Sequence, residues 1–303
     1  MLTRLAPSPS GDLHIGHARA FLAAWALARS QGGTVRLRIE DLDGPRVVPG
    51  AAERQMEDLR WLGLDWDGEV LYQSARTGYY DSVLAQLIKQ GLISACYQSR
   101  QDVARAATAP HGPEGVPPYP IALRPARPLA LAELPHHTEA ALRFSVPEGI
   151  VQFDDLFQGS QQQDVLQEVG DFVLRRRDGL YAYQLAVVAD DIAQGVTHIV
   201  RGADLLFSTA RQIQLWQALG AEPPVFGHVG LVLNAAGEKL SKRDGAVTLR
   251  AIREQGTKPQ ALIGHLAASL GIGDGRPCTP SEVANRFAVH AQGGEGWIFK
   301  EYL

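Results

Sequence analysis

The side chains best suited to chemistry stand in two short segments, one near the start of the chain and one in its last third. His14 and His17 lie three residues apart with Gly16 between them, where a predicted strand turns into a predicted helix. The N-terminus of a helix offers backbone N–H groups and a positive dipole end to an anion. Lys239 and Lys242 lie in a glycine-flanked loop, and lysines suit the crowded negative charge of a triphosphate. The two segments together predict an ATP site.

Each segment has a plainer interpretation when it is taken alone. A His-x-x-His pair at a helix start is more often structural or solvated, and lysines in a loop are more often solvated. The two segments in this order favour ATP chemistry. Asp190 and Asp191 are expected to be a structural or helix-capping pair, and the basic run 175–177 is either a solvated face or a contact with an RNA backbone.

The bulk composition excludes several classes of protein. The 303 residues include 29 Lys and Arg against 33 Asp and Glu, a formal net charge of −4, so any RNA contact requires a local basic patch. This length predicts a main domain with insertions or an appendage. No stretch has the pattern of a signal peptide or membrane span, and two cysteines are too few for a disulfide framework. We expect a soluble cytoplasmic protein with no membrane or DNA partner.

Strand-like and helix-like stretches alternate along the chain, which predicts an α/β fold with a parallel sheet. The β-α-β opening brings the histidines and the acidic run 40–43 to the carboxyl edge of that sheet, where ligands bind in such folds. Residues 106–135 are expected to be irregular. The expected strands are 3–6, 34–40, 141–146, 171–174, 182–188, 197–201 and 225–233, and the expected helices are 16–31, 51–62, 79–90, 207–219 and 257–270.

Several motifs in a fixed order carry a family resemblance. They are 4–11 (Arg-Leu-Ala-Pro-Ser-Pro-Ser-Gly), 14–17 (His-Ile-Gly-His), 38–43 (Arg-Ile-Glu-Asp-Leu-Asp), 45–53 (Pro-Arg-Val-Val-Pro-Gly-Ala-Ala-Glu), 194–204 (Gln-Gly-Val-Thr-His-Ile-Val-Arg-Gly-Ala-Asp) and 239–242 (Lys-Leu-Ser-Lys). The sequence resembles the class I aminoacyl-tRNA synthetases of the glutamyl/glutaminyl group. The motif at 45–53 is similar to the glutamyl-Q tRNA(Asp) synthetases within that group. The resemblance covers most of residues 1–250.

The resemblance implies a Rossmann-like parallel sheet with an inserted α+β subdomain and a short helical C-terminal region. The implied division is 1–94 for the first half of the catalytic domain, 95–180 for the inserted, acceptor-binding-like subdomain, 181–235 for the second half, and 236–303 for the lysine loop and a helical stem-contact region.

The activity implied by the resemblance is tRNA-independent activation of L-glutamate with ATP, which yields glutamyl-adenylate. About sixty residues follow the lysine segment, too few for the helical anticodon-binding region of a full glutamyl-tRNA synthetase. The implied acceptor is therefore the queuosine base at the wobble position of tRNA(Asp), with the anticodon arm gripped by the catalytic domain. Two alternatives stay open. One is a truncated glutamyl-tRNA synthetase or another glutamate adenylate-forming ligase with a different acceptor, and the other is an inactive paralogue that only binds tRNA.

The resemblance also implies a role for each site residue. For glutamate, Arg4 and Arg201 face the carboxylates, Glu40 takes the ammonium, Tyr183 contributes a hydroxyl, and Ala6 and Ser8 line the pocket. For ATP, the residues are His14, Gly16, His17, Leu231, Ser241 and Lys242, with His14, His17, Lys239 and Lys242 acting on the phosphates during reaction. A guanidinium binds a carboxylate bidentately, which favours glutamate over glutamine. Mg²⁺ is expected with the triphosphate.

Each glutamate-site residue also has a structural interpretation. Glu40 and Asp41 can close a strand and cap the next element, Tyr183 can be a core aromatic with a satisfied hydroxyl, and Arg201 can form an ordinary surface ion pair.

The zinc-binding residues of the resembled family are incomplete in this sequence. The family commonly binds zinc in the inserted subdomain through a Cys-x-Cys pair, a tyrosine and a third cysteine. Cys96 and Tyr119 stand at two of these positions, but Gln98 and Leu123 replace thiolates. A glutamine amide is a poor zinc ligand and leucine cannot ligate. We therefore expect no zinc.

Overall fold

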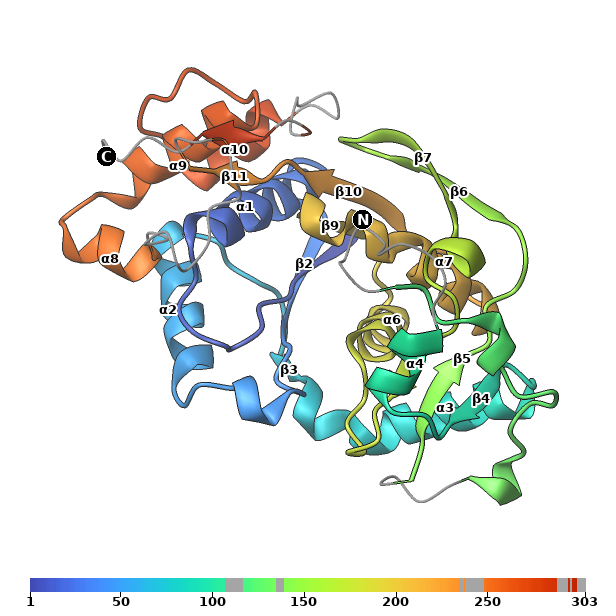
Figure 1. The fold of residues 1–303 in the computed structure, drawn as a ribbon. Helices are drawn as coiled ribbons and strands as arrows, with labels where there is room; N and C mark the ends of the chain where they lie inside the picture. The colour runs from blue at the N-terminus through green and yellow to red at the C-terminus, as the bar shows by residue number, and fades with distance from the viewer. Residues whose placement is uncertain are drawn as a thin grey trace.

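The computed structural model describes residues 1–106, 117–134, 139–234, 237, 248–287, 294 and 296–298. Figure 1 shows a helix-flanked strand layer, with the C-terminal helices packed beside α1 and the described elements of residues 77–175 on the opposite side of the molecule. Among the described residues, no helix combines the length and the apolar composition needed to cross a membrane.

The centre of the fold is a layer of parallel strands that comes from two distant parts of the chain. Parallel neighbours run in the order β3, β2, β1 on one side and β9, β10, β6 on the other. The two sides meet where the Thr197 N–H donates to the Leu2 carbonyl at 2.9 Å. The strands are β1 (Leu2–Leu5), β2 (Thr34–Ile39), β3 (Leu71–Tyr72), β6 (Ile150–Asp155), β9 (His198–Gly202) and β10 (Val225–Val229). The predicted α/β class with a parallel sheet is confirmed.

The described part of residues 77–175 builds a separate antiparallel sheet, and one hairpin of this stretch pairs with the central layer. β4, β5 and β8 form the antiparallel sheet, while β6 and β7 form the hairpin that reaches β10. The hairpin was not expected from the sequence. The elements are α3 (Thr77–Lys89), β4 (Ile93–Cys96), α4 (Arg100–Ala106), β5 (Ala141–Phe144), β7 (Gly159–Asp164), α5 (Val165–Glu168) and β8 (Phe172–Arg175). The predicted domain boundaries at 94, 180 and 235 stay predictions.

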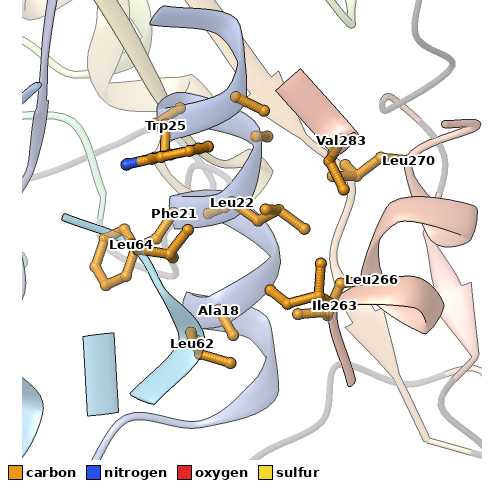
Figure 2. Close-up of a cluster of buried hydrophobic side chains, with 14 of the residues drawn as sticks. Ala18, Phe21, Leu22, Trp25, Leu62, Leu64, Ile263, Leu266, Leu270 and Val283 are labelled. Carbon is orange, nitrogen blue, oxygen red and sulfur yellow. The ribbon is translucent and has the colours of Figure 1, made fainter. Parts of the chain in front are cut away.

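α1 (Ile15–Ser30) is buried nearly all round, because its many alanines let neighbouring elements approach on every side. Figure 2 shows Leu62 and Leu64 against one side of α1, and Ile263 and Leu266 against the other. The surrounding helices are α2 (Ala51–Leu62), α9 (Pro259–Ser269) and α10 (Pro280–Arg286), and the remaining C-terminal elements are α8 (Leu249–Glu254), β11 (Val232–Leu233) and β12 (Trp297–Ile298).

Two predicted elements are wrong. The strand expected at 182–188 is the first half of a helix, α6 (Tyr183–Gln194). Because α6 buries every residue of 185–191, it lacks the polar face that reveals a helical period. The strand expected at 225–233 is interrupted after Val229, and the chain continues as β11, which pairs with β12.

Other predicted elements hold within a few residues. The helix expected at 51–62 has those bounds as α2. The helix expected at 207–219 divides into a 3-10 turn and α7 (Thr209–Ala218). The irregular stretch expected at 106–135 falls partly outside the described residues, and 117–134 contains only short 3-10 turns.

Truncation of Ile263 tests the packing of α9 against α1. Ile263 is fully buried, so Ile263→Ala is expected to lower the free energy of unfolding by about 2–5 kcal/mol. Gln260→Ala, on the exposed side of the same helix, is expected to change it by no more than about 0.5 kcal/mol. Urea denaturation followed by circular dichroism measures both, and equal effects would contradict the assigned core.

Candidate active site

The predicted site residues that the structure describes all line one cavity of about 730 Å³. The cavity lies at the carboxyl ends of β1, β2 and β9 and beside the start of α1. Its predicted members are Arg4, Ala6, Ser8, His14, Gly16, His17, Glu40, Tyr183, Arg201 and Leu231. Lys239, Ser241 and Lys242 lie outside the described residues.

The two histidines form a reciprocal cap on α1. The Gly16 N–H donates to His14 Nδ1 at 3.1 Å, and the His14 N–H donates to His17 Nδ1 at 3.2 Å. Because both Nδ1 atoms accept, the neutral form of each ring carries its proton on Nε2. The ring centroids lie 3.7 Å apart. The cap therefore sets the orientation and the tautomer of both imidazoles at the cavity wall.

Gly16 allows the close approach of the His14 ring. A Cβ atom at this position would lie 3.0 Å from His14 Cε1 and 3.1 Å from its Nδ1. A larger residue would push the imidazole from its capping position. The glycine thus preserves the histidine geometry and also leaves bare backbone at the cavity wall.

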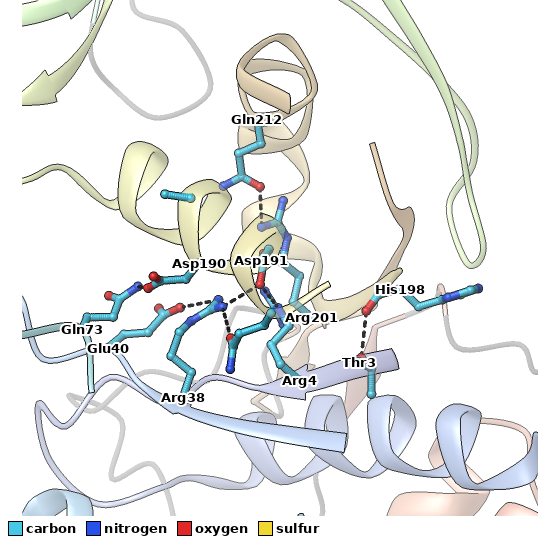
Figure 3. Close-up of polar contacts among 12 residues, drawn as sticks. Thr3, Arg4, Arg38, Glu40, Gln73, Asp190, Asp191, His198, Arg201 and Gln212 are labelled. Carbon is cyan, nitrogen blue, oxygen red and sulfur yellow. Dashed lines mark hydrogen bonds and ion pairs between the residues drawn. The ribbon is translucent and has the colours of Figure 1, made fainter. Parts of the chain in front are cut away.

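Arg4 and Glu40 are held in the cavity by a buried ionic network, which Figure 3 shows. Asp191 Oδ1 accepts from Arg4 Nε at 3.2 Å and from Arg38 Nη1 at 2.7 Å. Arg38 Nη2 donates to Glu40 at 3.2 Å, and Arg38 itself is fully buried. Among the described residues, only the Nε of Arg4 is engaged. The outer end of Arg4 can therefore meet a ligand.

Burial and charge act in opposite directions on this network. Burial pulls the pKa of Arg38 down, but the carboxylates of Asp191 and Glu40 outweigh it and leave that pKa raised. Burial raises the pKa of Glu40, and the guanidinium groups of Arg38 and Arg4 only partly offset it. Protonation of Glu40 on acidification would remove the negative charge from this part of the cavity.

Arg201 differs from Arg4 because its partners are neutral. It is 5% exposed, and none of the described carboxylates lies within ion-pair distance of it. Burial lowers its pKa. It donates to His228 Nε2 at 2.9 Å, Gln212 Oε1 at 2.8 Å, Thr209 Oγ1 at 3.0 Å, Tyr183 Oη at 3.4 Å and the Leu205 carbonyl at 3.4 Å. The last two contacts are long for hydrogen bonds, so an incoming anion can replace them.

Several residues of the site were missed or underrated by the sequence interpretation. Asp190 and Asp191 are structural, as expected, but they do not cap a helix. Asp190 accepts from Gln73, Arg76 and Tyr80 at 2.5–2.9 Å, and both acids are nearly fully buried. The sequence signal for this role was the presence of two adjacent acidic residues, Asp190 and Asp191, in an otherwise apolar stretch. His228 had no sequence signal, because its partners lie on distant strands.

The basic run at 175–177 is not a uniform solvated face. Arg175 is 7% exposed, whereas Arg177 is exposed. Arg176 pairs with Asp43 at 3.3 Å and lines the cavity. One member of the run therefore reaches the site itself.

The fold and site together define a class I aminoacyl-tRNA synthetase catalytic domain. The family described as "tRNA synthetases class I (E and Q), catalytic domain" matches residues 1–301. A glutamate tRNA ligase from Elizabethkingia meningosepticum, solved in complex with its amino acid, superposes with a TM-score of 0.82 at 28% identity. The match covers 99% of this chain and 67% of that one.

More specific relatives share the length of this chain. A glutamyl-Q tRNA(Asp) synthetase of Geobacter sulfurreducens is 47% identical over 277 residues, which are 91% of this chain and 86% of the relative. One of Nocardia farcinica is 45% identical over 299 residues, which are 98% and 93% of the two chains. The chain belongs to the glutamyl-Q tRNA(Asp) synthetase family, as its motifs predicted.

The residues at the four positions of the resembled zinc site, Cys96, Gln98, Tyr119 and Leu123, make other contacts. The Cys96 thiol lies 3.4 Å from Gln98 Oε1, and the Tyr119 hydroxyl donates to the Leu123 carbonyl at 3.0 Å. The Arg143 guanidinium lies 4.1 Å from the centre of the Tyr119 ring. One thiol, an amide and a phenol do not make a tetrahedral zinc site. Within the described parts of the chain, no three His, Cys, Asp or Glu side chains are grouped for a metal.

Metal analysis tests the expected absence of zinc. We expect purified protein to contain far less than one zinc per chain by plasma mass spectrometry, because Leu123 and Gln98 remove two ligands. Chelator treatment is expected to leave the melting temperature unchanged. One tightly bound zinc per chain would contradict this prediction.

Proposed function

We propose that the chain activates L-glutamate with ATP and transfers the glutamyl group to the queuosine base of tRNA(Asp). The names of the relatives support the acceptor, and the family supports ATP-dependent ligase chemistry. The observation that carries the amino-acid assignment is the buried guanidinium of Arg201, which contacts only neutral groups. We also propose the division into catalytic halves and an inserted subdomain, and action in the cytoplasm, where tRNA is available.

The charges of the site complement glutamate. Around the two guanidinium groups, Arg4, Arg38 and Arg201 supply three positive charges and Asp191 and Glu40 two negative ones, a net charge of one positive, and the other charged residues of the cavity wall, Arg46, Arg176, Asp43 and Asp204, are two of each sign. Glutamate carries one net negative charge at neutral pH, from two carboxylates and one ammonium. Arg4 and Arg201 face the carboxylates and Glu40 faces the ammonium. The Tyr183 hydroxyl, which accepts from Arg201 Nη1 at 3.4 Å, donates its own proton to the carboxylate that Arg201 faces.

Glutamine is rejected by the same charges. Its neutral amide cannot compensate the buried charge of a guanidinium, and a charge left buried without a counter-ion is strongly unfavourable. A site built around such groups discriminates by the cost of leaving them unpaired. Selectivity for glutamate over glutamine therefore follows from the burial of the guanidinium groups as well as from their direct contact with the ligand.

ATP occupies the other side of the cavity, beside the start of α1. The glutamate carboxylate attacks the α-phosphate, the bond to pyrophosphate breaks, and charge builds on both groups. His14 and His17 hold their Nε2–H donors at this wall, and the backbone of Gly16 and Leu231 completes it. Lys239 and Lys242, with Ser241 between them, neutralise the pyrophosphate. Mg²⁺ arrives with ATP as part of the substrate.

The reaction needs no side-chain nucleophile in this scheme. Rate enhancement comes from positioning and from charges fixed before the reaction starts. Removing one such donor typically costs about 3 kcal/mol of transition-state stabilisation. The acyl group of the adenylate then passes to a hydroxyl of the modified base, and AMP leaves.

Labelling of tRNA(Asp) tests the acceptor. We expect radiolabelled glutamate to be transferred to tRNA(Asp) that contains queuosine and not to the same tRNA that lacks it. Periodate oxidation would attack the diols of both the 3′ end and queuosine. A tRNA that ends in 2′,3′-dideoxyadenosine is therefore the cleaner control, because its terminal ribose has no hydroxyl that can accept the glutamyl group. Transfer that requires a free 3′ end, or that ignores queuosine, would identify a truncated glutamyl-tRNA synthetase instead.

Substitution of Glu40 tests the ammonium site. In ATP–pyrophosphate exchange without tRNA, Glu40→Gln is expected to raise the KM for glutamate about tenfold or more and to leave the KM for ATP nearly unchanged. Glu69→Gln, at an exposed position outside the cavity, is the matched control. A parallel rise in both KM values would contradict the assignment.

The pH dependence gives the same test a second readout. Because burial raises the pKa of Glu40, acidification protonates it and removes the charge that holds the ammonium. The KM for glutamate is therefore expected to rise as the pH falls, and this rise is expected to be smaller in Glu40→Gln.

A further inference from the structure

A chain of hydrogen bonds runs from the hairpin of the inserted segment to the proposed glutamate site. Asp155 on β6 contacts His228 Nδ1 at 2.5 Å, and His228 Nε2 accepts from Arg201 Nε at 2.9 Å. The three side chains are between 0% and 5% exposed. They come from β6, β10 and β9, the three strands on one side of the central layer. Neither Asp155 nor His228 lines the cavity itself.

The direction of each hydrogen bond is fixed by chemistry. A guanidinium nitrogen can only donate, so His228 Nε2 must accept from Arg201. The imidazole proton then resides on Nδ1, where the carboxylate of Asp155 accepts it. Burial and the neighbouring Arg201 charge lower the pKa of His228, and the Asp155 contact only partly offsets this. A neutral imidazole with its proton on Nδ1 therefore lies between the acid and the guanidinium.

Asp155 is oriented by the turn that follows it. Its Oδ1 accepts backbone N–H groups from Phe157 at 3.0 Å, Gln158 at 3.0 Å and His228 at 2.9 Å. These three donors occupy one carboxylate oxygen and direct the other toward the imidazole. The β6–β7 hairpin thus delivers a carboxylate of fixed orientation to β10.

We propose that Asp155 and His228 are positioning residues for glutamate, acting through Arg201. This rests on the proposed function, in which Arg201 binds a glutamate carboxylate. A carboxylate in direct contact with Arg201 would compete with that of the substrate. The His228 imidazole accepts the Nε–H of Arg201 and adds no negative charge. The positive charge of Arg201 therefore stays available to the ligand. Arg4, by contrast, shares its charge with Asp191.

The variant Asp155→Asn reverses this chain of hydrogen bonds while keeping its shape. The three backbone donors keep the amide oxygen at the Oδ1 position, so the NH₂ group must face His228 Nδ1. That nitrogen then accepts, and the imidazole proton moves to Nε2. The N–H groups of His228 and Arg201 would then face each other, so the hydrogen bond that holds the guanidinium would be lost, and only the Thr209 hydroxyl, 3.2 Å from His228 Nε2, could accept the new proton.

Kinetics of ATP–pyrophosphate exchange measure the consequence. Asp155→Asn is expected to raise the KM for glutamate about ten- to hundredfold, with the KM for ATP changed by no more than about twofold. The control is Asp154→Asn, because Asp154 is the exposed neighbour that contacts Ser160 on the partner strand of the hairpin. An unchanged KM for glutamate in folded Asp155→Asn would overturn the proposal, as would equal effects on both substrates.

The histidine tautomer gives a readout that does not require activity. Long-range ¹H–¹⁵N correlation spectra of the wild-type protein are expected to show His228 protonated on Nδ1 alone, with its signals assigned by their loss in His228→Gln. Protonation on Nε2, or on both nitrogens at neutral pH, would overturn the proposal even if Asp155→Asn does not fold. Absence of glutamate-dependent exchange in the wild-type protein would instead count against the proposed function.

Discussion

One carboxylate, that of Asp191, is the interaction on which the arrangement of the site depends. It is 1% exposed and meets the guanidinium groups of Arg4 and Arg38, which are 4% and 0% exposed. A carboxylate buried without a partner would cost several kcal/mol, so the burial of Asp191 on α6 depends on the arginines that β1 and β2 supply. The fold and the ligand site are therefore specified by the same contacts. Asp190, its neighbour, accepts from Arg76 in the 3-10 turn before α3 and from Tyr80 in α3, and so extends this constraint to that helix.

Features that depend on neighbouring residues could be predicted from the sequence, whereas contacts between residues far apart in the chain could not. The capping histidines, the acidic end of β2 and the bounds of α2 follow from short patterns, and the structure has them where expected. α6 was mistaken for a strand because both of its faces are buried in the stretch that was assigned. The pairing of Asp155 with His228 joins positions 73 residues apart, and no periodicity encodes it. Side-chain roles inside the cavity likewise came from family resemblance, since spacing alone could not place Arg4 beside Asp191.

The described residues from 248 onward do not line the cavity, but they help to position the proposed ATP site through their contacts with α1. Arg19 on α1 donates to the Gly230 carbonyl, and to the Ser269 carbonyl of α9 at 2.9 Å. Burial lowers the pKa of Arg19 to about 10, which leaves it charged at neutral pH. This single side chain ties the histidine helix to the turn between β10 and β11 and to α9. The position of His14 is thus coupled to the segment that precedes Lys239 and Lys242 in the sequence.

The two guanidinium groups of the glutamate site are unequal, and the difference bears on selectivity. Arg4 already pairs with Asp191, which it shares with Arg38, so a ligand carboxylate adds a second partner to a partly neutralised ion. Arg201 is surrounded by an imidazole, an amide and two hydroxyls, and none of these offsets its charge. The electrostatic gain from a carboxylate, and the cost of leaving the site with a neutral amide, are therefore both larger at Arg201. In the proposed site, Arg201 therefore provides most of the discrimination between glutamate and glutamine. Its neighbours are neutral because the imidazole of His228 lies between its guanidinium and the carboxylate of Asp155.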